Sequence, residues 1–186
     1  MIINIVKQSK KLMREQTVKN GAPAWGLTEI AAAKGKELAK KYKVDEKLVM
    51  TSLYLAHTIF DTDKNSKIRK NHTNLSADFA LKKLKNWNVS NNDQKIIANA
   101  IQAHHASVPT TSLIAEVVKN AECFKFVTLR GGLIFLHDLG RRGYSYKQAV
   151  TYVLEKMNEK IKYLTFRECI KEAEKNKKII IDIFSV

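Results

Sequence analysis

Hydrophobic residues recur every three or four positions along most of the chain. This spacing places them on one face of an α-helix, whereas a half-buried strand would alternate polar and apolar residues. With 2 prolines and 7 glycines to interrupt the pattern, the sequence predicts an all-α protein. Helices are predicted, with ends uncertain by about 2–4 residues, at 3–18, 26–43, 45–58, 73–87, 91–105, 110–127, 129–140, 146–161 and 165–184.

The pattern is interrupted where Gly, Pro or polar residues gather: at Gly21-Ala22-Pro23, 61–71, 88–92, Pro109 and 140–143. No repeat, low-complexity segment or linker divides the chain. Its 186 residues and 45% hydrophobic content suit one domain with its own core. We therefore predict a single-domain helical bundle over 1–186, in which 1–24 form an N-terminal helix with its connection and 25–186 form the core.

Histidines lie on the apolar faces of two predicted helices. Val49 and Leu53 lead to His57 at four-residue spacing, so its imidazole points where core residues point. If that helix continues one more turn, Asp61 shares the face and either binds a metal with His57 or orients its ring. On another helix His104 and His105 extend apolar lines, so one of the two must face inward.

A carboxylate lies in a third apolar line, where Glu122 stands between Val118 and Phe126. Burying it is costly unless it is paired, protonated or bound to a cation. His72 opens the predicted helix 73–87, where free backbone N–H groups favour an anion, although an exposed loop histidine explains it equally well. Any one of these groups alone is best explained as structural. Together they favour a metal or phosphohydrolase site in the bundle core.

Four segments resemble, in order and spacing, the HD-domain superfamily of metal-dependent phosphohydrolases. "LAHTIFDTDK" (55–64) is similar to its central "LLHD" segment, and "NHTNLSADFA" (71–80) to the histidine-containing helix that follows. "IQAHHASVP" (101–109) resembles its paired-histidine segment, and "KNAECFKF" (119–126) stands where the family has a late aspartate. The resemblance extends from about Trp25 onward and implies the family's all-α fold.

The chain departs from the family pattern at several ligands. No histidine precedes His57, and Trp25 or Gly26 stands near the place of the family's first ligand. Thr58 replaces the aspartate of the His-Asp pair, and Glu122 replaces the late aspartate. With one residue deleted, "HTIFDTD" is similar to the "HDxxEDT" of alarmone hydrolases, which would make Asp61 the recovered carboxylate.

The resemblance implies a phosphohydrolase, or a catalytically diverged descendant, that acts on or binds a nucleotide or another phosphoester. His57, Asp61, Glu122 and His72 would then hold a divalent metal. Mn, Mg, Ni, Fe and Zn all suit such a set, and its retention is left open. His104 or His105 would contact the phosphate or transfer a proton, Asp61 would act beside the metal, and Lys64 would neutralise substrate charge.

A second His-Asp pair, His137-Asp138, falls after the late-aspartate segment, where the family has no ligand. A structural explanation suffices for it, because His137, Arg141 and Arg142 are basic groups near a predicted helix C-terminus.

The chain is strongly basic, with 33 lysines and arginines against 18 aspartates and glutamates and a net charge of +15. This favours anionic partners, and a nucleic-acid-binding or adaptor protein without catalysis is the alternative function. Cys123 and Cys169 lack metal-site spacing and are predicted to be buried. No apolar run is long enough to span a membrane or to form a signal peptide, so we expect a cytoplasmic protein.

Overall fold

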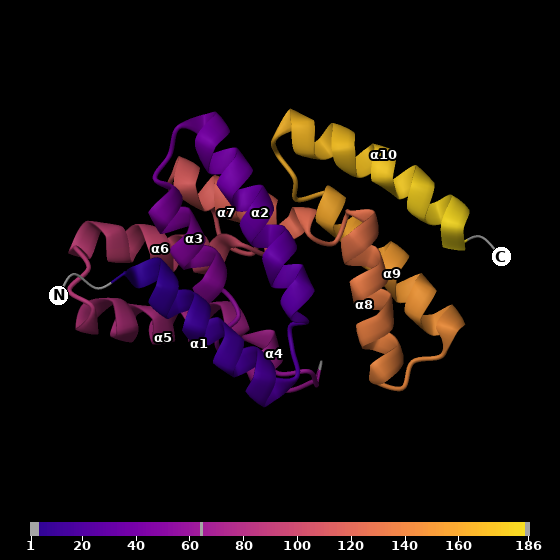
Figure 1. Ribbon diagram of the computed structural model, residues 1–186, viewed down its shortest axis with the longest axis horizontal. Helices are drawn as coiled ribbons and strands as arrows, with labels where there is room; N and C mark the ends of the chain where they lie inside the picture. The colour runs from indigo at the N-terminus through magenta and orange to yellow at the C-terminus, as the bar shows by residue number, and fades with distance from the viewer. Residues whose placement is uncertain (1–3, 64, 185–186) are drawn as a thin grey trace.

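A computed structural model describes residues 4–63 and 65–184, and within these ranges the chain is helical without strands (Figure 1). This confirms the predicted all-α class. The helices are α1 (Ile5–Asn20), α2 (Trp25–Tyr42), α3 (Glu46–Leu55), α4 (Lys67–Lys70), α5 (His72–Asn86), α6 (Asn91–Ala103), α7 (Leu113–Phe124), α8 (Leu129–Arg141), α9 (Tyr146–Ile161) and α10 (Arg167–Phe184).

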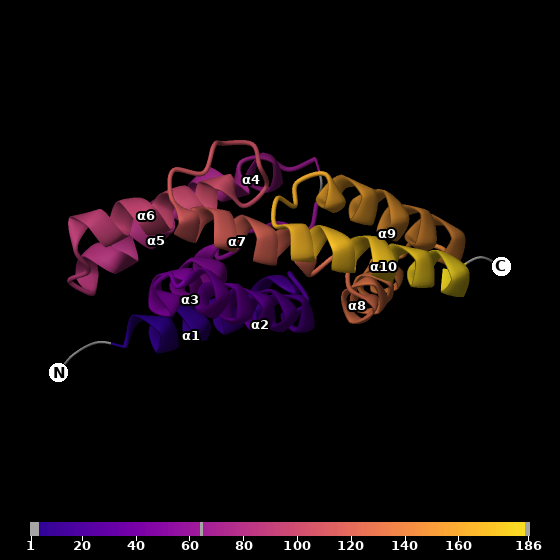
Figure 2. The same ribbon diagram turned by 90° about the horizontal axis from the view of Figure 1, so that it is seen from above.

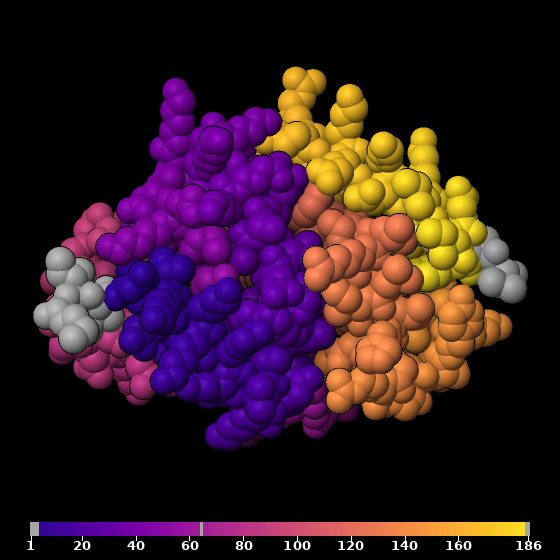
Figure 3. Space-filling model, in the orientation of Figure 1, coloured from indigo at the N-terminus to yellow at the C-terminus, as the bar shows by residue number. Residues whose placement is uncertain are grey.

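Helix α7 lies between two groups of helices. On one side α1 packs on α3, α5 packs on α6, and α3 and α6 contact each other. On the other side α8, α9 and α10 pack together, and α2 and α7 connect them to the first group. Figure 2 shows α7 between the layer of α1 to α3 and the layer of α4 to α6, and α10 farther along the molecule between α8 and α9. In the space-filling view the two groups meet along α2 and α8 (Figure 3).

The core is built from the apolar faces that the periodicity predicts. Its largest cluster runs from Leu38 and Leu53 through Val118 to Met157 and Ile180, so it joins α2, α3, α7, α9 and α10. Cys123 and Cys169 are free and buried in it, as predicted. No helix in the described part of the chain is long and apolar enough to cross a membrane.

Most helices begin at a side chain that caps them. Asn4, Asp45, Ser66, Ser90, Ser112, Thr128 and Ser145 each accept a hydrogen bond from a backbone N–H of the first turn. The short helix α4, which follows the cap at Ser66, lies inside the stretch that we predicted to be a break. It brings Arg69 next to the start of α5.

Helices α3 and α6 end earlier than predicted, and histidines follow both of these ends. Helix α3 stops at Leu55 because the Thr58 hydroxyl donates to the Leu55 carbonyl and the Ile59 N–H donates to Ser76 of α5. His57 therefore lies in a turn. Helix α6 stops at Ala103, and its C-cap residue His104 bonds through its ring to the Ile101 carbonyl.

Candidate functional site

Three histidines from separate helix ends meet inside the protein. His57 follows α3, His72 opens α5 and His104 closes α6, and all three are buried. One ligand nitrogen from each lies within 4.8 Å of the other two. The ring centroids of His57 and His104 are 4.7 Å apart, and each lies 5.5 Å from that of His72. We call this group the histidine cluster.

Backbone carbonyls fix the tautomers of two cluster members. Nδ1 of His72 lies 2.8 Å from the Arg69 carbonyl, and Nδ1 of His104 lies 2.5 Å from the Ile101 carbonyl. A carbonyl only accepts hydrogen bonds, so Nδ1 carries the proton in each neutral ring and Nε2 carries the lone pair. Both Nε2 atoms are buried without a hydrogen-bond partner in the described structure.

A carboxylate fixes the third tautomer in the opposite sense. Nε2 of His57 donates to Glu122 Oε2 at 2.9 Å, so its lone pair is on Nδ1, which is buried and also unpartnered within the described ranges. The cluster thus holds three ring nitrogens with free lone pairs. In metal sites a ligating histidine commonly donates its other N–H to a carboxylate or backbone carbonyl.

Burial keeps the cluster neutral. Desolvation lowers the pKa of His57, of His104 and of His72, the last to about 3, and neighbouring cations or imidazoles lower each further. At neutral pH each ring therefore keeps its lone pair. Neutral imidazole is the form that binds a metal.

A buried ion pair supports His57. Lys125 and Glu122 are 1% and 3% exposed, and Lys125 Nζ donates to Glu122 Oε2 at 2.5 Å. The same ammonium lies 3.3 Å from His57 Nε2, but both groups are donors when Nε2 carries the proton, so they share the Glu122 carboxylate and do not bond to each other. Burial alone would raise the pKa of Glu122, but the Lys125 ammonium and His57 hold it well below its usual range.

This pairing changes the role predicted for Glu122. Its buried carboxylate was expected to be paired, protonated or bound to a cation, and in the structure it is paired with Lys125. The metal-capable group that the structure assembles contains the three histidines without Glu122. Lys125 was missed by the sequence analysis, although its i,i+3 spacing from Glu122 on a helix was a usable signal.

Gly131 of α8 packs against the Lys125 carbonyl, where a side chain would collide with the backbone.

Two other residues considered from the sequence, Asp61 and Trp25, have hydrogen-bond partners outside the histidine cluster. We expected Asp61 to share a face with His57 if the helix continued one more turn. It does not continue, because α3 ends at Leu55, and the Asp61 carboxylate accepts from the Asp63 N–H. Lys64 lies outside the described residues. Trp25, near the family's first-ligand position, opens α2 and donates to Glu29.

His105 lies next to the histidine cluster and is half-buried. Its ring centroid is 4.3 Å from that of His104 and 6.1 Å from that of His57. Its Nδ1 lies 2.8 Å from Nζ of Lys160, a buried lysine of α9. Lysine only donates, so His105 accepts through Nδ1 and carries its proton on Nε2. We predicted that at least one of His104 and His105 faces inward, and in the structure both lie at the site.

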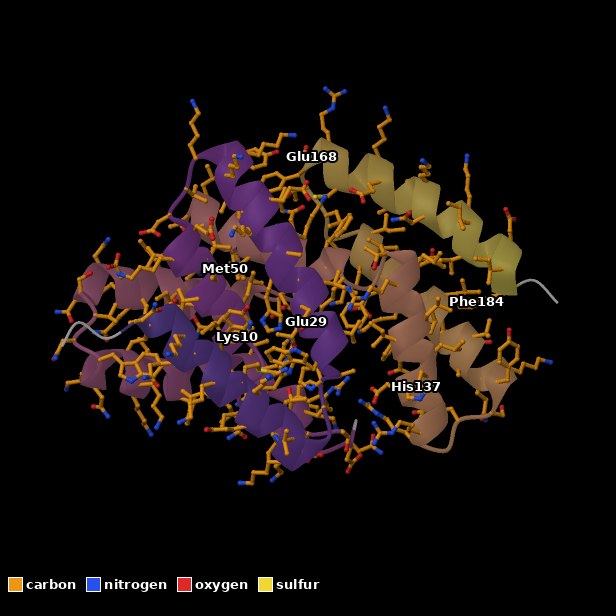
Figure 4. The ribbon with its side chains drawn as sticks, in the orientation of Figure 1. Lys10, Glu29, Met50, His137, Glu168 and Phe184 are labelled. Carbon is orange, nitrogen blue, oxygen red and sulfur yellow. The ribbon has the colours of Figure 1, made fainter. Side chains whose placement is uncertain are left out.

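The second His-Asp pair has the structural role expected of it. His137 is exposed on α8 (Figure 4), and buried Asp138 forms an ion pair with Arg142 one turn later. Neither belongs to the histidine cluster.

A cavity of about 360 Å³ lies between α4, α8 and α9, and the three cluster histidines are not among its lining residues. Arg69, Arg142, Phe135, Tyr144 and Tyr152 are among the residues that line it. Arg69 connects the two regions, since its carbonyl accepts from His72 and its guanidinium lies 4.3 Å from the centroid of Phe60. The Phe60 ring in turn packs edge-on against the rings of His57 and His72.

The same fold occurs in known proteins. Bacillus subtilis YpgQ in complex with ADP superposes with a TM-score of 0.72 and 16% identity, over 98% of this chain and 94% of that chain. A second YpgQ structure gives 0.71 and 16%, over 98% and 95%. A Lactobacillus plantarum protein gives 0.70 and 15%, over 98% and 92%. At these identities the similarity shows the fold. No family model matches the chain, and no curated protein matches it.

The neutral cluster predicts that acid destabilises the protein. Below the pH of about 6.5 at which an unfolded histidine titrates, the unfolded chain binds protons that the buried rings do not. The free energy of unfolding should fall as the pH decreases from about 6.5 toward the folded pKa, by up to about 1.4 kcal/mol per pH unit for each histidine. Urea titrations should show a shallower decline in His72→Gln than in the unchanged protein. The exposed His137→Gln is the control, and equal slopes for all three would contradict the account.

Breaking the buried ion pair should be severe. Lys125→Met leaves Glu122 as an unpaired buried charge and should lower the free energy of unfolding by about 3–5 kcal/mol. Adding Glu122→Gln removes that charge and should recover part of the loss. Chemical denaturation measures both variants, with the exposed Lys147→Met of α9 as the control. A double variant less stable than Lys125→Met alone would refute this explanation.

Proposed function

We propose that this protein is an HD-type phosphohydrolase, or a diverged descendant, that binds a nucleotide or another phosphoester beside a divalent metal. The observation that carries the proposal is the convergence of three neutral, buried imidazoles with unpartnered nitrogens. Orphaned buried polar atoms are costly, and a bound cation would satisfy all three together. YpgQ, which shares the fold, forms a complex with ADP, which supports a nucleotide ligand.

The three histidines of the cluster suit a metal ion, although they are not the ligand set of the HD-domain family. His57, His72 and His104 would hold the ion, and nitrogen ligands favour Zn, Ni or Fe over Mg. The two positions where the family has aspartates are occupied here by Thr58 and Glu122. The Thr58 hydroxyl donates to the Leu55 carbonyl, and Glu122 accepts from Lys125, so both side chains already have partners within the protein. Glu122 would instead orient His57. When bound, the metal would polarise a phosphate oxygen and lower the pKa of a bound water.

His105 is the cluster's neighbour best placed for proton transfer. Its Nδ1 accepts a hydrogen bond from Lys160, so the neutral ring carries its proton on Nε2. Because His104 belongs to the three-nitrogen set, His105 takes the role that the sequence assigned to either histidine. It would donate a hydrogen bond from Nε2 to a phosphate oxygen or a leaving group.

A basic nucleic-acid-binding protein remains the alternative, because the net charge of +15 favours any polyanion. Binding of nucleic acid would fall steeply with salt and be independent of metal. The phosphohydrolase proposal instead requires metal retention through the histidine cluster.

Metal content tests the proposal directly. Protein purified without chelator, then loaded with Zn²⁺, Ni²⁺ or Mn²⁺ and gel-filtered, should retain about one ion per chain by elemental analysis, as expected of a single three-histidine site. His72→Gln and His104→Gln should lose it, whereas the exposed His137→Gln should retain it. Circular dichroism confirms that each variant is folded. Folded, unchanged protein that retains no ion under any loading condition would overturn the metal site.

A further inference from the structure

The ammonium of Lys125 lies where the sequence predicted a metal ion. His57 and Glu122 were expected to be among the ligands of that ion. In the structure Lys125 Nζ donates to Glu122 Oε2 at 2.5 Å and lies 3.3 Å from His57 Nε2. Lys125 is 1% exposed, so its charge is kept away from water. The place predicted for a metal therefore contains a cation that belongs to the chain itself.

The start of helix α8 fixes the main chain around Lys125. This residue is the C-cap of α7, and its carbonyl packs against Gly131, where the Cβ of any other residue would collide. The same carbonyl accepts from the Thr128 hydroxyl. At the other end of the side chain the ammonium lies 5.3 Å from the centroid of the Phe126 ring. A carboxylate and an aromatic face thus receive a charge whose position is set by the backbone.

The two groups beside this ammonium are spaced as metal ligands are. Glu122 Oε2 and His57 Nε2 are 2.9 Å apart. Zinc binds carboxylate oxygen and imidazole nitrogen at about 2.1 Å, so two such ligands with a right or tetrahedral angle between them are about 2.9–3.4 Å apart. An ion bound by both would take the lone pair of Nε2 and leave the ring proton on Nδ1.

Charge excludes an added ion while Lys125 is present. Lys125 and Glu122 are neutral as a pair, and Lys125 has no second ion pair in the described structure. A divalent ion placed between Glu122 and His57 would therefore meet an ammonium at short range. An ammonium also differs from a metal in its chemistry, because it supplies a charge and three donor hydrogens but no coordination position at which a water could be activated.

We propose that Lys125 is a tethered substitute for a metal ion at His57 and Glu122, so that this position holds a permanent cation that chelators cannot remove. An exogenous ion is then confined to the other side of His57, at Nδ1, and activation of water is confined there too. The inference goes beyond the proposed function and does not require the histidine cluster to bind metal, because it concerns Nε2 of His57 and its neighbours alone.

Truncating the lysine should turn its place into a metal site. Lys125→Ala removes the ammonium and leaves room for an ion, whereas Lys125→Met removes the ammonium and fills the room. Both are made in a His72→Gln background, in which the histidine cluster should hold no metal. Zn²⁺ should raise the urea midpoint of the Lys125→Ala protein and leave that of the Lys125→Met protein unchanged. Because the titrations are at equilibrium, the ion can enter as the chain folds.

A further substitution identifies the ligand. Adding Glu122→Gln to the Lys125→Ala protein should abolish the effect of Zn²⁺, although both proteins keep the same cysteines and histidines for binding zinc in the unfolded chain. Zinc should also move the His57 proton from Nε2 to Nδ1, which long-range ¹H–¹⁵N spectra detect and which an ordinary ion pair does not predict. If the Lys125→Ala protein is unfolded in buffer, Zn²⁺ should restore its helical circular dichroism.

Two results would overturn the inference. One is a Lys125→Ala protein that Zn²⁺ neither stabilises nor refolds, and the other is stabilisation that persists undiminished after Glu122→Gln. Failure of the proposed function is recognised separately, because it is seen as the absence of retained metal in the unchanged protein, where Lys125 and Glu122 are both intact.

Discussion

The buried carboxylate of Glu122 determines the state of the site. It is acceptor-only, so it fixes the proton of His57 on Nε2 and leaves the lone pair on Nδ1 toward the other histidines. It also balances the charge of Lys125, a cation that could not otherwise remain in the core. One side chain of α7 thereby orients a ring from the turn after α3 and neutralises its own neighbour.

Helix ends bring the remaining groups to this point. Stopping α3 at Leu55 and α6 at Ala103 turns His57 and His104 inward from loops, and α4 supplies the Arg69 carbonyl that holds His72. Each histidine's orienting hydrogen bond comes from outside the cluster. The lone pairs of the three rings are consequently left without a protein partner in the described structure.

Much of the fold could be predicted from the sequence, because helical periodicity reports directly which faces are buried. The same periodicity identified His57 and Glu122 as inward-facing. The prediction for Asp61 failed, because the end of α3 depends on hydrogen bonds made by Thr58 and by Ser76 of α5. Hydrogen bonds of this kind leave no trace in the hydrophobic periodicity of the sequence. Lys125 was overlooked since lysine is ordinarily exposed, and the cavity required α4, α8 and α9 to be placed together.

The tautomers of the buried histidines decide whether three lone pairs converge inside the protein. Long-range ¹H–¹⁵N correlation spectra of the metal-free protein at neutral pH resolve Nδ1–H from Nε2–H rings. Three neutral buried histidines are expected, with His72 and His104 protonated on Nδ1 and His57 on Nε2. Charged imidazolium signals from this group, or a His57 ring protonated on Nδ1, would contradict this expectation, because no set of converging lone pairs would then exist.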